Sequence, residues 1–326
     1  MQFKIRNLIL LMICEIASMF TAAADAAAAA PVDDLTSAVR IEQLYNAIHS
    51  NIVYTTANNY EAKLDIYSTA KPGKPRPTLL YIHGGGWMGG FNKEMVAVEF
   101  LPFLQIGWNV INVDYRPSSV SLAPAAIEDC LCALRWVERN AEAYNIDTRQ
   151  IVLMGHSAGA HLALMTGLVP LGKTGLGAPC ELSDMYGPPP EMVQKSSTFP
   201  KPAAIINWYG ITDVADLIQG PNQQPYAVLW IGNQFDPMQI AKIASPLNYV
   251  VPGVPPIITV HGDKDPLVSY NQAVRLHAAL TSAHVTNKLI TVPNGLHGRF
   301  GVAMTRDAWT QIFDFLDKLG LNMKPD

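Results

Sequence analysis

Residues 151–168 of this chain read IVLMGHSAGAHLALMTGL, and this segment determines the class of fold. The apolar run Ile151–Met154 predicts a buried strand, and Ala158–Leu168 has the apolar spacing of a helix. Between them stands Gly155-His156-Ser157-Ala158-Gly159. Glycines two residues either side of a serine suit a tight turn, where a Cβ would clash with neighbouring backbone. We therefore expect Ser157 to project from the carboxyl end of a strand, beside the positive N-terminus of a helix.

Short apolar runs and helical spans alternate on both sides of this segment. Most of the runs are continuously apolar, which is typical of parallel strands covered on both faces, whereas Ala62–Ile66 alternates and predicts a half-buried strand near an edge. The pattern predicts an α/β fold with a doubly wound, mostly parallel sheet and right-handed crossovers. The other expected strands are Thr78–Ile82, Trp108–Val113, Ala203–Tyr209, Pro256–Val260 and Lys288–Val292, and the other expected helices are 125–142, 270–282 and 307–319.

The body of the chain, residues 31–326, is expected to form a single domain. Residues 170–202 and 213–245 break the strand–helix rhythm, and we expect both to be insertions over the carboxyl edge of the sheet. Apolar residues make up 49% of the chain, which excludes disorder as its main state. The net charge of -4, without a basic run, argues against a nucleic-acid partner. No stretch of the body approaches the roughly 20 apolar residues that span a bilayer.

Residues 1–30 have the composition of a secretory signal peptide. Lys4 and Arg6 precede the apolar run Leu8–Phe20, and the Ala-rich stretch Ala22–Ala30 follows. Glu15 departs from the signal-peptide pattern, because a carboxylate within the apolar run opposes insertion into the membrane. We expect cleavage within the Ala-rich stretch, export to the periplasm or the medium, and no stable membrane insertion afterwards.

The four cysteines bear on the redox compartment. Cys14 would leave with the signal peptide. Cys130 and Cys132 lie two apart on an expected helix and point to different faces, so they are not expected to pair with each other. Buried free thiols are the simpler expectation for both, and Cys180, in a Pro/Gly-rich loop, is the candidate for a disulfide.

A serine hydroxyl becomes a nucleophile only when a base accepts its proton. In sheets of this kind, catalytic groups come from loops at the carboxyl ends of strands. Among the eight histidines, His297 meets this condition, because it lies between the last expected strand and the final helix. His277 and His284 belong near the opposite end of the sheet, and His261 is interpreted as part of a structural His-Gly turn.

The imidazole needs an acidic partner that fixes its tautomer and stabilises its charged form. Asp263 and Asp265 both follow the strand that ends at Val260. We favour Asp265, which lies further out on the loop, while Asp263 is placed to hold the turn; Asp213 is a lesser third candidate. The chain order is serine, aspartate, histidine.

The motif His83-Gly84-Gly85-Gly86-Trp87 follows another expected strand. Glycines let backbone N–H groups approach a substrate oxygen that becomes negative during acyl transfer, and the N–H of Ala158 is expected to donate to the same oxygen. A second interpretation exists, because these glycines and Gly89 also satisfy the dinucleotide pattern G-x-G-x-x-G. That interpretation leaves the serine, aspartate and histidine without a role. No metal-binding pattern occurs, so we expect neither a metal nor a cofactor.

Together these motifs resemble the α/β-hydrolase superfamily, with Asp114-Tyr115-Arg116 as a further match, over residues 60–319. Within it the chain is similar to hormone-sensitive-lipase-like and feruloyl-esterase-like carboxylesterases. The resemblance implies hydrolysis of esters, with Gly85, Gly86 and Ala158 as oxyanion donors and Ser157, Asp265 and His297 as the triad. His156 stands where bacterial hormone-sensitive-lipase-like enzymes usually have Asp, which shifts the likeness toward the feruloyl-esterase-like branch and kynurenine formamidases.

The expected substrate is a short-chain or aromatic acyl ester, either a small molecule or one linked to a polysaccharide. Aromatic side chains near the carboxyl edge are candidates for the pocket walls, and core packing is the alternative for each. A kynurenine-formamidase-like amidase and a non-catalytic binding module are the other functions considered. The candidate pocket residues are Trp87, Trp208, Tyr209 and Trp230.

Overall fold

A computed structural model describes residues 47–68, 74–89, 93–170, 176 and 201–321. Residues 47–326 cluster as one compact unit. The expected signal peptide, Cys14, Cys180 and nearly all of the expected insertion at 170–202 lie outside the described residues, so these expectations stay predictions.

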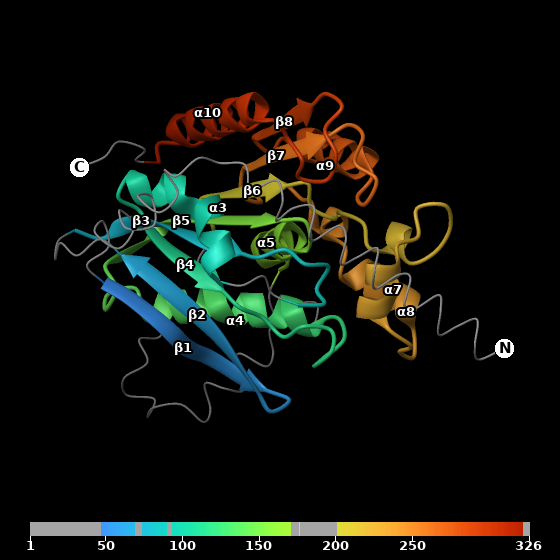
Figure 1. Cartoon of the computed structure of the whole chain (residues 1–326), viewed down its shortest axis with the longest axis horizontal. Coiled ribbons are helices and arrows are strands. Elements are labelled where there is room, and N and C mark those ends of the chain that lie inside the picture. The colour runs from blue at the N-terminus through green and yellow to red at the C-terminus, as the bar shows by residue number, and fades with distance from the viewer. Residues whose placement is uncertain (1–46, 69–73, 90–92, 171–175, 177–200, 322–326) are drawn as a thin grey trace. The chain divides into compact units, whose positions relative to one another are not determined.

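The described part of the chain contains an eight-stranded sheet in the order β1-β2-β4-β3-β5-β6-β7-β8 (Figure 1). The β1–β2 and β2–β4 pairs are antiparallel, and every other pair is parallel. The predicted doubly wound, mostly parallel sheet is therefore confirmed. The strands are β1 Ala47–Ala57, β2 Tyr60–Ser68, β3 Arg76–Ile82, β4 Asn109–Val113, β5 Ile146–His156, β6 Ala204–Trp208, β7 Ile257–Gly262 and β8 Asn287–Val292.

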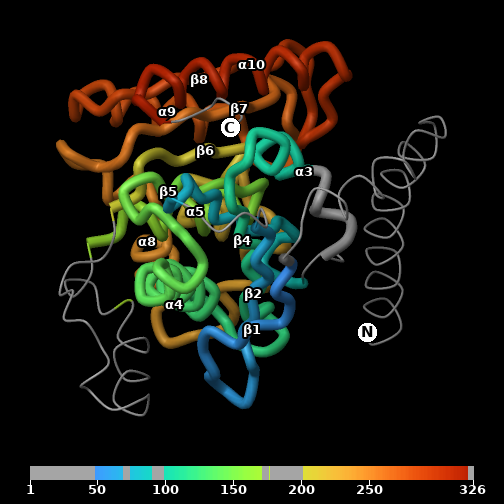
Figure 2. The backbone as a smooth tube through the Cα atoms, turned by 90° about the vertical axis from the view of Figure 1, so that its left-hand side faces the viewer, coloured from blue at the N-terminus to red at the C-terminus, as the bar shows by residue number. Residues whose placement is uncertain are grey.

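Helices cover both faces of the sheet. Figure 2 shows α3 and α4 on opposite sides of the strands, and α5 on the side of α4. On the α3 side, the ring of Phe103 contacts the ring of Trp309 in α10 at a centroid distance of 6.0 Å. The helices are α3 Lys93–Gln105, α4 Ala125–Arg139, α5 Ala158–Leu168, α7 Pro225–Ile231, α8 Pro237–Ile243, α9 Tyr270–Ser282 and α10 Val302–Lys318, with short 3₁₀ turns η2 Ala215–Leu217 and η3 Pro246–Tyr249.

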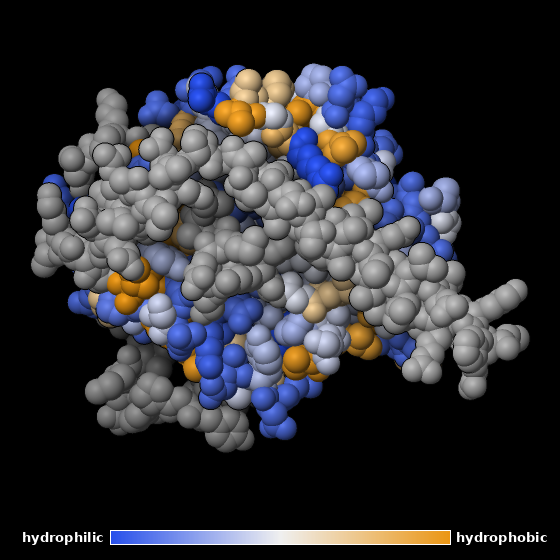
Figure 3. Space-filling model, viewed as in Figure 1, coloured by the Kyte–Doolittle hydropathy of each residue, from blue (hydrophilic) through white to orange (hydrophobic). Residues whose placement is uncertain are grey.

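The core lies where the central strands meet these helices. In β3 the side chains from Leu79 to Ile82 are at most 1% exposed. Burial of each large apolar side chain contributes roughly 1.5–3 kcal/mol relative to its exposed state, so these strands anchor the sheet. On the face shown in Figure 3, most described residues are hydrophilic and the apolar ones form small separate groups. Among the helices of the described ranges, none is long and apolar enough to cross a membrane.

The state of one cysteine differs from the prediction. Cys130 is a buried free thiol, as predicted, but Cys132, two residues further along α4, is disulfide-bonded. The expectation of a free thiol at Cys132 is therefore wrong. The two cysteines do not pair with each other, in agreement with their divergent directions on the helix.

The parallel part of the sheet determines where functional side chains can meet. Strands β3, β5, β6, β7 and β8 are neighbours in this order, so their carboxyl ends share one edge. The segments that begin at His83, Ser157, Tyr209, Asp263 and Pro293 all leave from that edge. In α/β sheets, ligands bind at this edge.

Candidate active site

Ser157 occupies a strained turn between β5 and α5. Its backbone has φ 54° and ψ -119°, in a positive-φ region that non-glycine residues rarely adopt. The Ser157 N–H donates to the carbonyl oxygen of Trp208 at 2.9 Å, which ties the turn to the neighbouring strand β6. The helix begins at the next residue, so the hydroxyl lies at the positive end of the α5 dipole.

The glycines around Ser157 are required by close backbone packing. A Cβ on Gly155 would overlap the backbone of Gly159, and a Cβ on Gly159 would overlap the carbonyl oxygen of Ile82. A Cβ on Gly84 would lie 2.7 Å from the carbonyl oxygen of His156. The turn at Ser157 and the glycine loop formed by His83, Gly84, Gly85, Gly86 and Trp87 are therefore in close contact.

The structure brings the serine, the histidine and one of the two aspartates together. His297 Nε2 lies 2.8 Å from Ser157 Oγ, and His297 Nδ1 lies 2.7 Å from Asp265 Oδ2. A carboxylate oxygen can only accept, so the proton of the neutral ring belongs on Nδ1. Nε2 is then free to accept the proton of the serine hydroxyl, the geometry that a nucleophile and its general base require.

Asp265 is held as a carboxylate by several donors. Its Oδ1 accepts the N–H groups of Leu267 at 2.8 Å and Val268 at 3.0 Å. Burial alone would raise the pKa of Asp265, but hydrogen bonds from His261 and His297 and the backbone N–H of Val268 lower it well below the usual range. This carboxyl is thus ionised at neutral pH and stabilises positive charge on His297.

The two rejected aspartates have other partners. Asp263 Oδ1 accepts the N–H of Asn294 at 2.7 Å, which clamps the loop before His297. The same two loops also meet at Gly262, where a Cβ would overlap the carbonyl oxygen of Gly295. Asp213 pairs with Arg275 Nη2 at 2.6 Å. The structure therefore places Asp265, and neither Asp263 nor Asp213, beside the imidazole.

Three backbone N–H groups near Ser157 are free to donate. Within the described ranges, the N–H groups of Gly85, Gly86 and Ala158 have no hydrogen-bond acceptor. Gly85 and Gly86 have φ 114° and 60°, which an L side chain would strain. Ala158 is the first residue of α5, where helices leave their N–H groups unpaired. Such donors suit the oxyanion of an acyl-transfer intermediate.

The glycine loop is fixed from behind by aromatic side chains. The Tyr115 hydroxyl donates to the carbonyl oxygens of His83 at 3.0 Å and Gly84 at 3.3 Å. The Trp87 indole N–H donates to His161 Nδ1 at 3.2 Å, and His161 Nε2 lies 2.7 Å from the carbonyl oxygen of Ala244. Burial lowers the pKa of His161 to about 4, so its ring is neutral and can accept from Trp87.

The aromatic residues expected to wall the pocket lie in different places. Trp87 and Trp230 are fully buried and stacked on each other at 4.0 Å, and Trp208 is 3% exposed. These three indoles pack inside the domain and expose at most 3% of their surface, so they do not wall an open pocket. Tyr209 differs: it is half-buried, and its ring contacts the His297 ring edge-to-face at 4.7 Å. Of the four candidates, Tyr209 is the one that lies directly beside the triad.

Two residues that no sequence motif indicates contact the segments on either side of Ser157, at His156 and at Gly86. Glu99 Oε2 of α3 lies 3.2 Å from His156 Nε2. Burial lowers the pKa of His156, although the Glu99 carboxylate opposes that shift. Tyr226 of α7 packs against Gly86, where a Cβ would lie 3.3 Å from the tyrosine Cβ. Neither residue belongs to a recognisable motif; only the fold brings them to the site.

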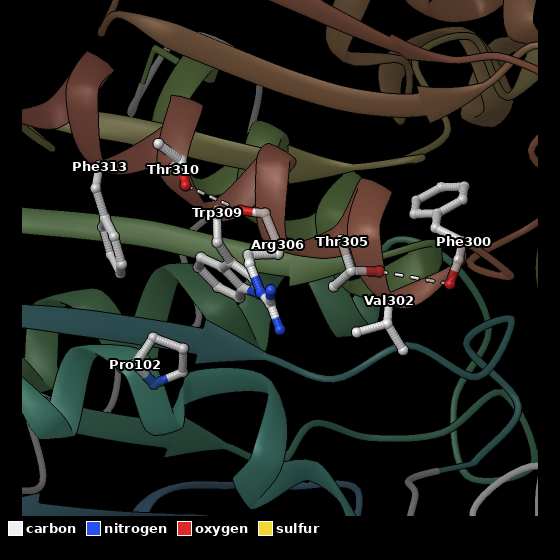
Figure 4. A pocket seen from close by; sticks show the side chains of 8 residues that line it. All are labelled: Pro102, Phe300, Val302, Thr305, Arg306, Trp309, Thr310 and Phe313. Carbon is white, nitrogen blue, oxygen red and sulfur yellow. Dashed lines mark hydrogen bonds between the residues drawn. The ribbon is translucent and has the colours of Figure 1, made fainter.

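A separate hollow of about 520 Å³ lies between α3 and α10 (Figure 4). It is mainly apolar, with Pro102 of α3 facing Arg306, Trp309 and Phe313 of α10. None of the three triad side chains lines it. Among the described residues, no group of three or more His, Cys, Asp or Glu side chains could hold a metal ion.

The sheet, the turn at Ser157 and the convergent loops define an α/β hydrolase, and comparison with known proteins identifies the branch. The chain belongs to the BD-FAE family, whose model matches residues 64–280. The predicted resemblance to α/β-hydrolase carboxylesterases is thereby confirmed. Esterase LipQ of Mycobacterium tuberculosis is 28% identical over 267 residues, which cover 80% of this chain and 59% of that protein. Carboxylesterase NlhH of the same organism is 28% identical over 70% of this chain and 68% of its own length.

Two solved esterase structures share this fold. A truncated carbohydrate esterase from gut microbiota superposes with a TM-score of 0.68 at 26% identity, over 86% of this chain and 98% of that one. A propionate-bound thermophilic esterase of Thermogutta terrifontis has a TM-score of 0.66 at 24% identity, over 85% and 96%, and at that identity it shows the fold alone. The chain spans about half the length of several curated relatives that it matches.

Proposed function

We propose that this protein is a serine carboxylesterase with Ser157 as nucleophile, His297 as general base and Asp265 as the acid that orients it. The observation that carries the proposal is the pair of short contacts from His297, 2.8 Å to Ser157 Oγ and 2.7 Å to Asp265 Oδ2. Membership of the BD-FAE family and the names of the esterase relatives support it.

In the proposed mechanism, Ser157 Oγ attacks the ester carbonyl carbon while its proton moves to His297 Nε2. The carbonyl oxygen becomes negative and accepts from the N–H groups of Gly85, Gly86 and Ala158. The tetrahedral intermediate collapses as His297 gives the proton to the leaving alcohol, so an acyl-serine remains. A water molecule then gives a proton to His297 Nε2 as it attacks the acyl carbon. The second tetrahedral intermediate releases the acid while His297 returns that proton to Ser157 Oγ, which regenerates the serine.

The proposed substrates are esters with short-chain or aromatic acyl groups. Tyr209 supports an aromatic or flat acyl group, because its half-buried ring lies against His297. An alcohol side that belongs to a carbohydrate is proposed from the carbohydrate esterase whose structure resembles this one.

Export of the protein is a further part of the proposal. The composition of residues 1–30 is that of a signal peptide. The disulfide at Cys132 supports the same conclusion, since disulfides persist mainly in oxidising compartments.

The test is hydrolysis of p-nitrophenyl esters and hydroxycinnamoyl esters of graded size by wild type and Ser157→Ala. Loss of the nucleophile is expected to lower kcat on the order of 10⁶-fold, by analogy with serine-protease triads. A Ser157→Ala protein with near wild-type turnover of p-nitrophenyl acetate would refute the assignment. N-formylkynurenine is assayed in parallel, and faster hydrolysis of that amide than of every ester would favour the formamidase alternative.

A further inference from the structure

His261 is a second imidazole that faces the acid of the proposed triad. It lies near the end of β7, at the carboxyl edge, and its side chain is fully buried. His261 Nε2 is 2.9 Å from the carbonyl oxygen of Val268 and 3.3 Å from Asp265 Oδ2. The same carboxylate oxygen, Oδ2, accepts from His297 at 2.7 Å.

The hydrogen-bond partners determine which nitrogen of His261 carries a proton. Both groups that face Nε2 are oxygens that can only accept, so Nε2 must be the donor. Nδ1 is buried and has no hydrogen-bond partner in the described part of the chain. A buried polar atom without a partner costs stability and calls for an explanation. The ring is oriented to offer Nε2–H, and Nδ1 is left unpaired as a consequence.

We propose that His261 is a positioning residue of the triad, whose Nε2–H is shared between Val268 O and Asp265 Oδ2 and holds the carboxylate in line with His297. This inference rests on the proposed esterase function. The backbone N–H groups of Leu267 and Val268 fix Oδ1, and the two imidazoles fix Oδ2. Every oxygen of the carboxylate then has two donors, so the group cannot rotate away from His297 without losing several of them.

A purely structural role is the competing explanation. The bond from Nε2 to Val268 O alone would close the loop that carries Asp265, and Tyr270 packs edge-to-face on the His261 ring at 5.8 Å. The two roles differ in what they predict for the acid. If His261 also donates to Oδ2, its loss makes the carboxylate more basic and a stronger partner for protonated His297. If His261 only holds the loop through Val268 O, its loss would leave the basicity of the Asp265 carboxylate unchanged.

Two substitutions separate these roles. His261→Gln can place an amide N–H near the position of Nε2, whereas His261→Met has similar length and no donor. His277 provides the matched control as His277→Met, because it is also buried and its Nδ1 lies 2.8 Å from Asn287 Oδ1, at the amino end of β8. Each variant is assayed with p-nitrophenyl acetate across pH 5–9, and its fold is checked by circular dichroism.

We expect His261→Met to lower kcat about 10-fold with little change in KM, the range of one hydrogen bond to a charged group. Its acid limb in the kcat/KM profile should move to higher pH by a few tenths of a unit. His261→Gln should restore most of kcat and the wild-type limb, and His277→Met should leave both unchanged. A folded His261→Met with wild-type kcat and limb overturns the inference. Equal losses in all three variants, with no movement of the limb, also overturn it.

Histidine-resolved ¹⁵N NMR of wild type gives a measurement that does not depend on the fold of a variant. His261 should carry its proton on Nε2 near neutral pH, and a proton on Nδ1 alone contradicts the inference. Wild-type turnover is measured first. An inactive wild type overturns the proposed function itself, whereas an active wild type with unaffected His261 variants overturns the role of His261 alone.

Discussion

Three residues with positive φ that are neither glycine nor asparagine lie at the candidate active site; among the described residues His284 is the fourth of this kind. Trp87, Ser157 and Tyr209 have φ of 58°, 54° and 41°, although none of them is glycine. Each follows a different parallel strand and turns the chain sharply at the carboxyl edge. Such conformations cost about 1–3 kcal/mol each and persist where the surroundings impose them. At Ser157 the strain holds the hydroxyl within reach of His297; at Tyr209 it sets the ring against the imidazole.

The side chain of Tyr209 packs closely against the backbone of Gly298. This glycine directly follows His297 and has φ 67°, and a Cβ there would lie 2.6 Å from the Tyr209 hydroxyl. The tyrosine therefore covers the backbone on one side of the imidazole.

The hydroxyl of Tyr115 provides a test of how the glycine loop is held. Tyr115→Phe removes the donor to the carbonyl oxygens of His83 and Gly84, so the N–H groups of Gly85 and Gly86 lose their alignment. We expect kcat to fall roughly 10-fold or more, and the free energy of unfolding to fall by about 1 kcal/mol.

Tyr249→Phe is the matched control, because its hydroxyl also donates to a backbone carbonyl, that of Ile243 at 2.7 Å. It should lose similar stability and keep kcat. Equal kcat in the two variants would show that Tyr115 does not orient the loop.

The three residues of the proposed triad could be predicted from the sequence because each follows the end of a strand. Ser157, Asp265 and His297 all lie one to five residues beyond a strand on the same sheet, and parallel order alone brings them to one edge. The roles of His261 and Tyr115 could not be predicted in this way. Both depend on a contact with a backbone oxygen or a carboxylate from another loop, and no spacing in the sequence encodes that contact.

Among helices and strands, the expected bounds agree best with the structure where the apolar pattern of the sequence is strong. Helix α5 and helix α9 match the expected bounds, whereas β5 begins at Ile146, five residues earlier than expected. The early part of β5, residues 147–150, is polar and ranges from the buried Asp147 to the exposed Arg149, so it has no apolar pattern. Strand β1 and helix α3 were not predicted at all: β1 is mostly exposed at the edge, and α3 contains Pro102, which normally interrupts a helix.

Helix α5 carries a buried histidine that makes stability depend on pH. Burial lowers the pKa of His161 to about 4 in the folded protein, from an ordinary value of 6.5. Protons therefore bind preferentially to the unfolded chain, so the contribution is complete above about pH 6.5 and is lost as the pH falls toward 4. The difference corresponds to about 3 kcal/mol at most.

Urea unfolding between pH 7 and 5 measures this dependence. His161→Gln can retain a donor to Ala244 O but cannot be protonated, so its stability should decline less steeply with acid than that of wild type. His156 and His277, whose pKa values burial also lowers, remain in both proteins and contribute equally. Parallel slopes for the two proteins would exclude His161 as a source of acid sensitivity.

For the molecule as a whole, the disulfide at Cys132 bears on the proposed export. Cys132 is bonded while Cys130, on the same helix, is free and fully buried, and burial raises the pKa of the Cys130 thiol well above its ordinary value. Alkylation in denaturant without reductant should therefore label Cys130 and leave Cys132 unlabelled. After reduction, the thiol of Cys132 should be labelled as well.

Peptide mapping of the protein purified after expression of the full chain measures this labelling. Reduction is expected to lower the free energy of unfolding by about 2–4 kcal/mol. Full labelling of Cys132 before reduction would contradict the bonded state. Sequencing of the N-terminus on the same material tests export, and a first residue within or just after Ala22–Ala30 is expected.

The proposed activity depends on activation of the Ser157 hydroxyl by His297. A fluorophosphonate probe forms a covalent bond with such a serine and does not require knowledge of the substrate. After labelling of the full-length protein, mass spectrometry of its peptides should find one adduct, on Ser157, and none in Ser157→Ala or in protein unfolded before labelling. His297→Gln should label far more slowly. An unlabelled native protein, or an adduct on a different serine, would contradict the account.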